Sequence, residues 1–116
     1  MSGLKIYARM KAKPGFEAAL LEWCRGTVEK VRSDPHTVAF GFYQDATTGH
    51  IVVLEHYFDV AACIGHMKNV ADNLKLLRPM LDFDQHLLQV FGDVTPEIRD
   101  HYAPWKPTYF PEIAGL

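Results

Sequence analysis

The stretch TVAFGFYQDATTGHIVVLEHYF, residues 37–58, decides the fold, because it contains two apolar strand patterns joined by a short loop. Residues 37–44 are rich in Val, Phe and Tyr, and residues 50–58 include an unbroken apolar run from Ile51 to Leu54. The loop between them ends in Gly49, a residue that tolerates a positive φ. The stretch therefore predicts a β-hairpin.

The segments before the hairpin predict a strand and a helix. Residues 4–11 alternate apolar and polar side chains, which is the period of a strand with one buried face. Residues 16–32 place apolar side chains three and four positions apart, as in an amphipathic helix. Ser33, Asp34 and Pro35 end that helix, because the residue before a proline is pushed out of the α region.

The segments after the hairpin predict a long helical region, a strand and a short helix. Asp59 suits a helix N-cap, and an apolar stripe continues to Leu77 with a break expected near residues 68–69. Pro79 ends this region, and residues 84–91 are expected to form the next strand. A short helix is expected from the Thr-Pro pair at residues 95–96 to about His101.

These elements follow the order β-α-β-β-α-β, which predicts an α+β fold of the ferredoxin-like type with a four-stranded antiparallel sheet. One domain is expected over residues 1–102, followed by an extended apolar tail over residues 103–116. Residues 51–54 are apolar on both faces of their strand, so the sheet face away from the helices also needs a cover. A homodimer that packs two sheets face to face meets that need.

Composition narrows the classes of function. The chain has 116 residues, of which 48% are hydrophobic and 22% charged, and its net charge is −2, as expected for one globular domain. No basic patch indicates nucleic-acid binding, no apolar run is long enough for a membrane span, and the N-terminus lacks the apolar core of a secretory signal. Cys24 and Cys63 are far apart in the sequence, so we expect buried, reduced thiols in a cytoplasmic protein.

Glu55 is the leading candidate for chemistry, because it interrupts an apolar strand and buried glutamates are rare unless paired. In a cavity, burial would raise its pKa and let it take a phenolic or enolic proton; the alternative is a structural pairing with Arg9. His66, in the long helical region, is a candidate proton shuttle, and its alternative is a hydrogen bond to a neighbouring carbonyl group. Tyr57 shares the strand face of Glu55 and is either a cavity residue or a core aromatic.

The sequence predicts no metal and no cofactor. Its six histidines form no HxH or HxxxH pair of the kind that zinc sites favour. The sequence also lacks the glycine-rich loops that bind dinucleotides or nucleoside triphosphates. His56 lies on the strand face opposite to Glu55 and is interpreted as a packing or surface residue. The remaining histidines are expected to be exposed to solvent: His36, His50, His86 and His101.

Two groups of residues resemble the antibiotic biosynthesis monooxygenase family. Lys13-Pro14-Gly15 matches the family's junction between the first strand and the first helix. Residues 54–66 match a family pattern of a Glu, an aromatic residue, an acidic cap, an Ala, and a His eleven positions after the Glu. The resemblance covers residues 3 to about 92, which is nearly the whole expected domain.

The resemblance implies a dimeric α/β barrel that holds a ligand cavity. It also implies a small oxygenase that oxidises quinols, anthrones or related phenols without metal or flavin. Glu55 and His66 would then be catalytic, and Tyr57, Val53 and Ala8 would contact the substrate. Val53 stands where some members carry an Asn.

Haem chemistry is not expected from the resemblance. Haem-degrading relatives carry an Asn in the first strand, a Trp in the second helix and an axial His about ten residues later, whereas the matching positions here are Ala8, His66 and Leu76. The first expectation is therefore a cofactor-independent monooxygenase acting on a small aromatic or phenolic substrate. The alternatives are a non-catalytic small-ligand-binding or accessory module, and an isomerase or cyclase that uses the same site for proton transfer.

Overall fold

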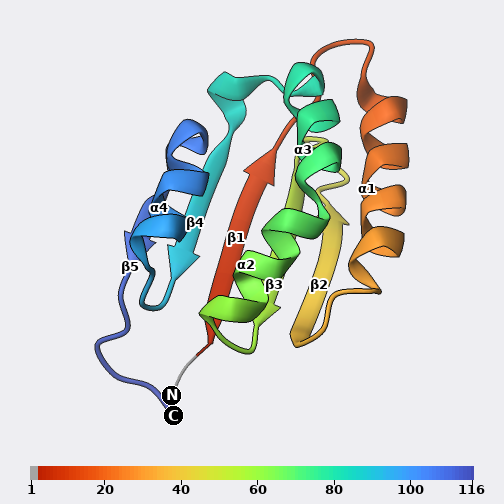
Figure 1. Ribbon diagram of the computed structural model, residues 1–116. Coiled ribbons are helices and arrows are strands. Elements are labelled where there is room, and N and C mark those ends of the chain that lie inside the picture. Colours follow the sequence, from red (N-terminus) through yellow and green to blue (C-terminus); the bar gives the residue numbers. More distant parts are fainter. Residues whose placement is uncertain (1–2) are drawn as a thin grey trace.

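The computed structural model describes residues 3–116, which form one sheet covered on one side by helices (Figure 1). The sheet has five strands in the order β2-β3-β1-β4-β5. The strands are β1 (Leu4–Met10), β2 (Thr37–Gln44), β3 (Ile51–Tyr57), β4 (Leu87–Phe91) and β5 (Thr108–Phe110). The first four pair antiparallel, as predicted, whereas β5 pairs with β4 in parallel.

The prediction of a four-stranded antiparallel sheet is therefore wrong in one respect. The tail after residue 102 adds a fifth strand at the sheet edge, next to β4. A three-residue strand between Pro107 and Pro111 carries little sequence signal of its own. It forms because the edge of β4 offers backbone groups that need hydrogen-bond partners.

Four α-helices within the described residues lie on the same face of the sheet (Figure 1). They are α1 (Glu17–Val31), α2 (Val60–Asn69), α3 (Ala71–Leu77) and α4 (Pro96–Tyr102). The predicted order β-α-β-β-α-β is confirmed, and so is the break in the long helical region, which falls at Val70 between α2 and α3. Within residues 3–116 no helix combines the length and apolarity needed to cross a membrane.

Short polar contacts decide where individual elements begin. The Asp59 side chain accepts a hydrogen bond from the backbone nitrogen of Ala62 at 2.8 Å and caps α2, as predicted. Asp82 accepts one from the backbone nitrogen of Asp84 and starts a 3-10 turn over Phe83–Gln85. Because of that turn, β4 begins at Leu87 rather than at residue 84.

The core lies between the sheet and the helices, because successive strand residues point to opposite faces. Trp105, from the tail, packs against both clusters of buried residues, and Tyr109 packs against one of them, so the tail lies on the domain. The strand side chains buried on this inner face are Leu4, Ile6, Met10, Ile51, Val53, Tyr57, Leu88 and Val90.

The outer face of the sheet carries large side chains that are exposed in the single chain. Tyr43 of β2 is 61% exposed and Leu54 of β3 is 46% exposed. Both border a broad hollow on this face, which Tyr7 and the last residues of the tail, 111–114, also border. Because β2 and β3 carry large apolar side chains on both faces, the outer face of the sheet exposes an apolar surface in the single chain.

Gly92 is a position at which a side chain does not fit. Its φ is +118°, and a Cβ there would lie 2.9 Å from the carbonyl oxygen of Gly3. We predict that Gly92→Ala lowers the free energy of unfolding by roughly 2–5 kcal/mol through backbone strain and overpacking. Gly49→Ala is the matched control, since Gly49 has φ +80° and open space around it, and should cost about 1–2 kcal/mol. Urea unfolding checks both values, and equal losses would contradict the steric argument.

Candidate active site

A mostly apolar cavity of about 90 Å³ lies between the sheet and the helices. Ala8, in the middle of β1, lies at its floor between Val53 of β3 and Leu88 of β4, with which it is paired in register. The small side chain of Ala8 leaves room above the sheet at this point. The ionisable residues that border the cavity are Glu55, His66, His86 and Tyr102.

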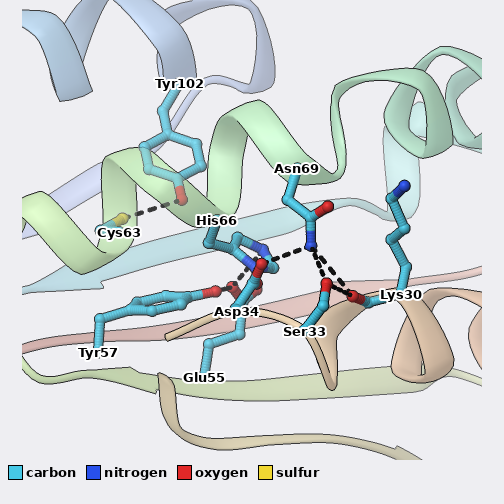
Figure 2. Close-up of polar contacts among 9 residues, drawn as sticks. All are labelled: Lys30, Ser33, Asp34, Glu55, Tyr57, Cys63, His66, Asn69 and Tyr102. Atoms are coloured by element: carbon cyan, nitrogen blue, oxygen red, sulfur yellow. Dashed lines mark hydrogen bonds and ion pairs between the residues drawn. The ribbon is translucent and has the colours of Figure 1, made fainter. Parts of the chain in front are cut away.

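Glu55 reaches the cavity from β3, and its side chain is only 12% exposed. It accepts a hydrogen bond from the Tyr57 hydroxyl group, and its Oε1 lies 3.6 Å from Nε2 of His66 (Figure 2). Burial raises the pKa of Glu55, although the His66 imidazole and the Tyr57 hydrogen bond oppose the shift. The alternative of a pairing with Arg9 is wrong, because strand alternation places Arg9 on the other face of the sheet.

His66 lies on α2 and is 6% exposed. Its Nδ1 is 2.7 Å from Oδ2 of Asp34, which lies in the connection between α1 and β2 (Figure 2). A carboxylate only accepts hydrogen bonds, so Nδ1 donates to Asp34, and Nε2 is directed toward Glu55. The alternative of a carbonyl partner for His66 is therefore wrong. The rings of Phe40 and Tyr57 lie beside the imidazole, with centroids 5.3 and 4.9 Å away.

Asp34 is held in place by its own partners, and the sequence reasoning did not find its role. Its side chain is 3% exposed, and Asn69 Nδ2 donates a hydrogen bond to its second oxygen (Figure 2). Asn69 also donates to the carbonyl oxygen of Lys30 at 3.0 Å, which ties α2 to the end of α1. The spacing of His66 and Asn69, three residues apart on one helix face, was a signal that both side chains share a polar partner.

Comparison with known proteins identifies the family of this chain. A family model for antibiotic biosynthesis monooxygenase matches residues 4–71, which is more than half of the chain. The chain belongs to this family. The match includes Asp34, Glu55 and His66 and ends at the start of α3. No curated protein matches the sequence.

Solved structures share the fold of this family member. MupZ from Pseudomonas fluorescens is 18% identical, with a TM-score of 0.81, and the alignment covers 100% of this chain and 94% of that chain. A crystal structure of an antibiotic biosynthesis monooxygenase is 26% identical, with a TM-score of 0.67 and coverage of 80% and 99%. Rv0793 from Mycobacterium tuberculosis is 17% identical, with a TM-score of 0.70 and coverage of 79% and 95%.

The polar end of the cavity in this family member is suited to moving one proton. Nε2 of His66 and the carboxyl group of Glu55 face the same apolar space, and either takes a proton from an acidic hydroxyl or carbon acid placed there. Asp34 fixes the orientation of the imidazole through the hydrogen bond from Nδ1. The rings of Phe40 and Tyr57 pack beside the imidazole, and such apolar surroundings strengthen these interactions.

Of the three residues predicted to contact a substrate, two border the cavity and one does not. Val53, 5% exposed, and Ala8 border the cavity. Tyr57 is completely buried and is not among the residues that border the cavity, because its hydroxyl group is directed at Glu55 and its ring packs beside His66. Tyr57 therefore contacts the site indirectly, by donating a hydrogen bond to Glu55.

Three of the four histidines predicted at the surface are partly buried, so that prediction is wrong for His50, His86 and His101. Nε2 of His86 is 2.9 Å from the carbonyl oxygen of Trp105, because the tail folds back over the start of β4. Tyr102, on α4, borders the cavity and lies with its hydroxyl group 3.8 Å from Sγ of Cys63 (Figure 2). His86 and Tyr102 were not identified as cavity residues from the sequence, because neither belongs to the two motifs at residues 13–15 and 54–66.

The two cysteines have no nucleophilic character. Cys24 and Cys63 are free and buried, and burial raises the pKa of each thiol to about 12. Within residues 3–116, no three His, Cys, Asp or Glu side chains are grouped so that they could hold a metal ion.

Replacing Glu55 with Gln removes the titration of a buried carboxyl group. At a pH above the ordinary pKa of a glutamate, 4.5, and below the raised pKa of Glu55, the carboxyl group keeps its proton in the folded protein. In the unfolded chain the same group has released it. The free energy of unfolding of the wild type should therefore fall with rising pH in that window, relative to Glu55→Gln, by up to about 1.4 kcal/mol per pH unit.

Urea unfolding from pH 4.5 to neutrality measures this trend. Glu29→Gln is the control, because it removes a carboxylate that is exposed on α1. A constant difference in stability between the wild type and Glu55→Gln over this range would contradict the raised pKa.

Proposed function

We propose that the chain is a cofactor-independent monooxygenase of the quinol or anthrone type that acts on a small aromatic or phenolic substrate. The observation that carries the proposal is a buried carboxyl group beside an imidazole in an apolar cavity, within a chain of the monooxygenase family. The 26% identity to a solved antibiotic biosynthesis monooxygenase supports the same reaction class. Glu55 and His66 are the proposed catalytic residues, and Val53 and Ala8 contact the substrate.

In the proposed reaction, Glu55 or His66 takes a proton from the substrate and leaves an electron-rich anion in the dry cavity. The anion passes one electron to dioxygen, and the substrate radical and superoxide combine to form a carbon–oxygen bond. The resulting peroxide takes a proton from the site. Loss of the hydrogen on the same carbon then breaks the O–O bond, so the substrate gains a carbonyl oxygen and the second oxygen atom leaves as water.

The size of the cavity limits how a substrate binds. At about 90 Å³ it is smaller than the roughly 150 Å³ apolar cavity that accepts a benzene molecule in another protein. Binding of an aromatic substrate therefore requires lining side chains to move. Trp105, Leu74 and Leu81 border both this cavity and a larger groove of about 940 Å³, so we place the route of entry at these three side chains.

The proposal includes a homodimer formed through the outer face of the sheet. Exposed Tyr43 and Leu54 support it, since large apolar patches on a monomer mark interaction surfaces. Two such faces packed together make the dimeric α/β barrel that the family resemblance implies. A cytoplasmic location is part of the same proposal, and the two free thiols support it.

Dioxygen uptake by metal-stripped protein tests the proposed reaction. With a panel of quinols, anthrones and naphthols, we predict uptake above the protein-free rate that survives chelation. Glu55→Gln should lower it by about 10²–10⁴-fold. His66→Ala and Asp34→Asn should also lower it, because the imidazole or its orienting partner is lost. Glu29→Gln should leave it unchanged, since Glu29 is exposed on α1.

If uptake equals the protein-free rate across the panel, the monooxygenase proposal fails and the chain is better described as a ligand-binding or accessory module. If substrate is consumed without dioxygen uptake, the site catalyses a proton transfer such as isomerisation or cyclisation.

Leu54→Lys tests the proposed dimer. Leu54 lies on the outer face and is 46% exposed, so a charge there leaves the fold of the single chain intact. We predict that the wild type sediments as a dimer and that Leu54→Lys sediments as a monomer, because the charge would be buried without a partner. Leu76→Lys, at a 68% exposed position on α3, is the control and should remain dimeric. A monomeric wild type, or a dimeric Leu54→Lys, would refute this interface.

A further inference from the structure

The cavity has a second polar end that the proposed reaction does not use. Glu55 is paired across the sheet with Ile6, whereas His86 lies two residues before Leu88, which is paired with Ala8. Glu55 and His86 therefore lie about 13 Å apart along the strands and about 10 Å apart across them. These are separations between backbone positions, and the side chains of both residues border the same cavity.

The backbone directs His86 toward the inner layer. Its φ and ψ are −82° and 140°, which is extended, so it continues the alternation of β4 and shares the face of buried Leu88. Its ring is stacked on Phe83, with centroids 4.7 Å apart and planes at 16°, and lies beside Trp105 at 5.6 Å. These contacts hold the imidazole in one orientation.

The tautomer of His86 follows from its one hydrogen bond. Nε2 lies 2.9 Å from the carbonyl oxygen of Trp105, and a carbonyl only accepts, so Nε2 carries the hydrogen and Nδ1 carries the lone pair. Burial and the nearby charge of Arg78 lower the pKa of His86, which keeps the ring neutral.

Nδ1 of His86 is buried and has no hydrogen-bond partner among residues 3–116. Buried acceptors are rarely left without a donor, so this atom needs one from outside the described chain. The Tyr102 hydroxyl group, which also borders the cavity, faces Sγ of Cys63 near the Glu55 end and is therefore not a donor to His86. A donor carried by the ligand would meet the need of His86.

We infer that Nδ1 of His86 accepts a hydrogen bond from a hydroxyl group of the substrate. The site thereby selects an elongated aromatic molecule with hydroxyl groups at both ends. One hydroxyl lies at Glu55 and His66, where the proton is removed, and the other lies at His86, which is a specificity residue and not a catalytic one. This inference rests on the proposed function for the identity of the reacting end.

Binding of two naphthalene probes without turnover tests the inference. The probes are 2,6-dihydroxynaphthalene and 6-methoxy-2-naphthol, which differ in a hydrogen-bond donor at one end, and binding is measured under anaerobic conditions by fluorescence titration. The wild type should bind the diol about three- to tenfold more tightly. His86→Phe, which keeps a stacked ring but no acceptor, should bind both probes equally. His50→Phe is the control, because His50 contacts Thr48 and Gln85 away from the cavity, and it should keep the preference.

A second measurement on the wild type covers the case in which His86→Phe does not fold. In protein labelled with ¹⁵N-histidine, the Nδ1 resonance of His86 should shift when the diol is added and stay in place when the methoxy compound is added. Equal affinities for the two probes, no binding of either, or a preference that persists in folded His86→Phe would each overturn the inference. Failure of the proposed function is separate, because it is indicated by dioxygen uptake equal to the protein-free rate, which the anaerobic binding measurement does not involve.

Discussion

The hydrogen bond between Nδ1 of His66 and the carboxylate of Asp34 is the contact on which the polar end of the cavity depends. It joins α2 to the connection after α1, and through Nε2 it also places the imidazole beside Glu55 on β3. Each of the three groups is nearly buried, and each would be costly to bury alone. They are therefore tolerated as a set, and loss of one leaves an uncompensated charge or donor in an apolar layer.

Strand alternation and helix caps made most of the fold predictable, because both depend on residues close together in the sequence. Asp34 was interpreted only as the end of a helix, since its partner His66 lies 32 residues away and no local pattern connects them. β5 was missed because a strand of three residues forms only beside an existing edge. His86 was placed at the surface for a related reason, as its burial depends on the carbonyl group and ring of Trp105 in the tail.

The residues that border the cavity come from two parts of the chain, one inside the family match and one after it. Asp34, Glu55 and His66 lie within the matched residues 4–71, whereas His86 and Trp105 lie after them. Proton transfer is thus assigned to the shared part, and recognition of the far end of the substrate to the part outside the match. A division of this kind lets related chains keep one arrangement of acid and base while accepting different molecules.

The position of β5 also affects how the protein behaves at high concentration. An uncovered strand edge can pair with other chains. On the side of β4 away from β1, β5 covers this edge with a segment of only three residues flanked by Pro107 and Pro111. At the opposite edge, β2 carries an irregularity in register between Thr37 and Ala39, which interrupts a regular ladder. The sheet therefore ends in a very short strand next to prolines, which leaves little regular edge for pairing with another chain.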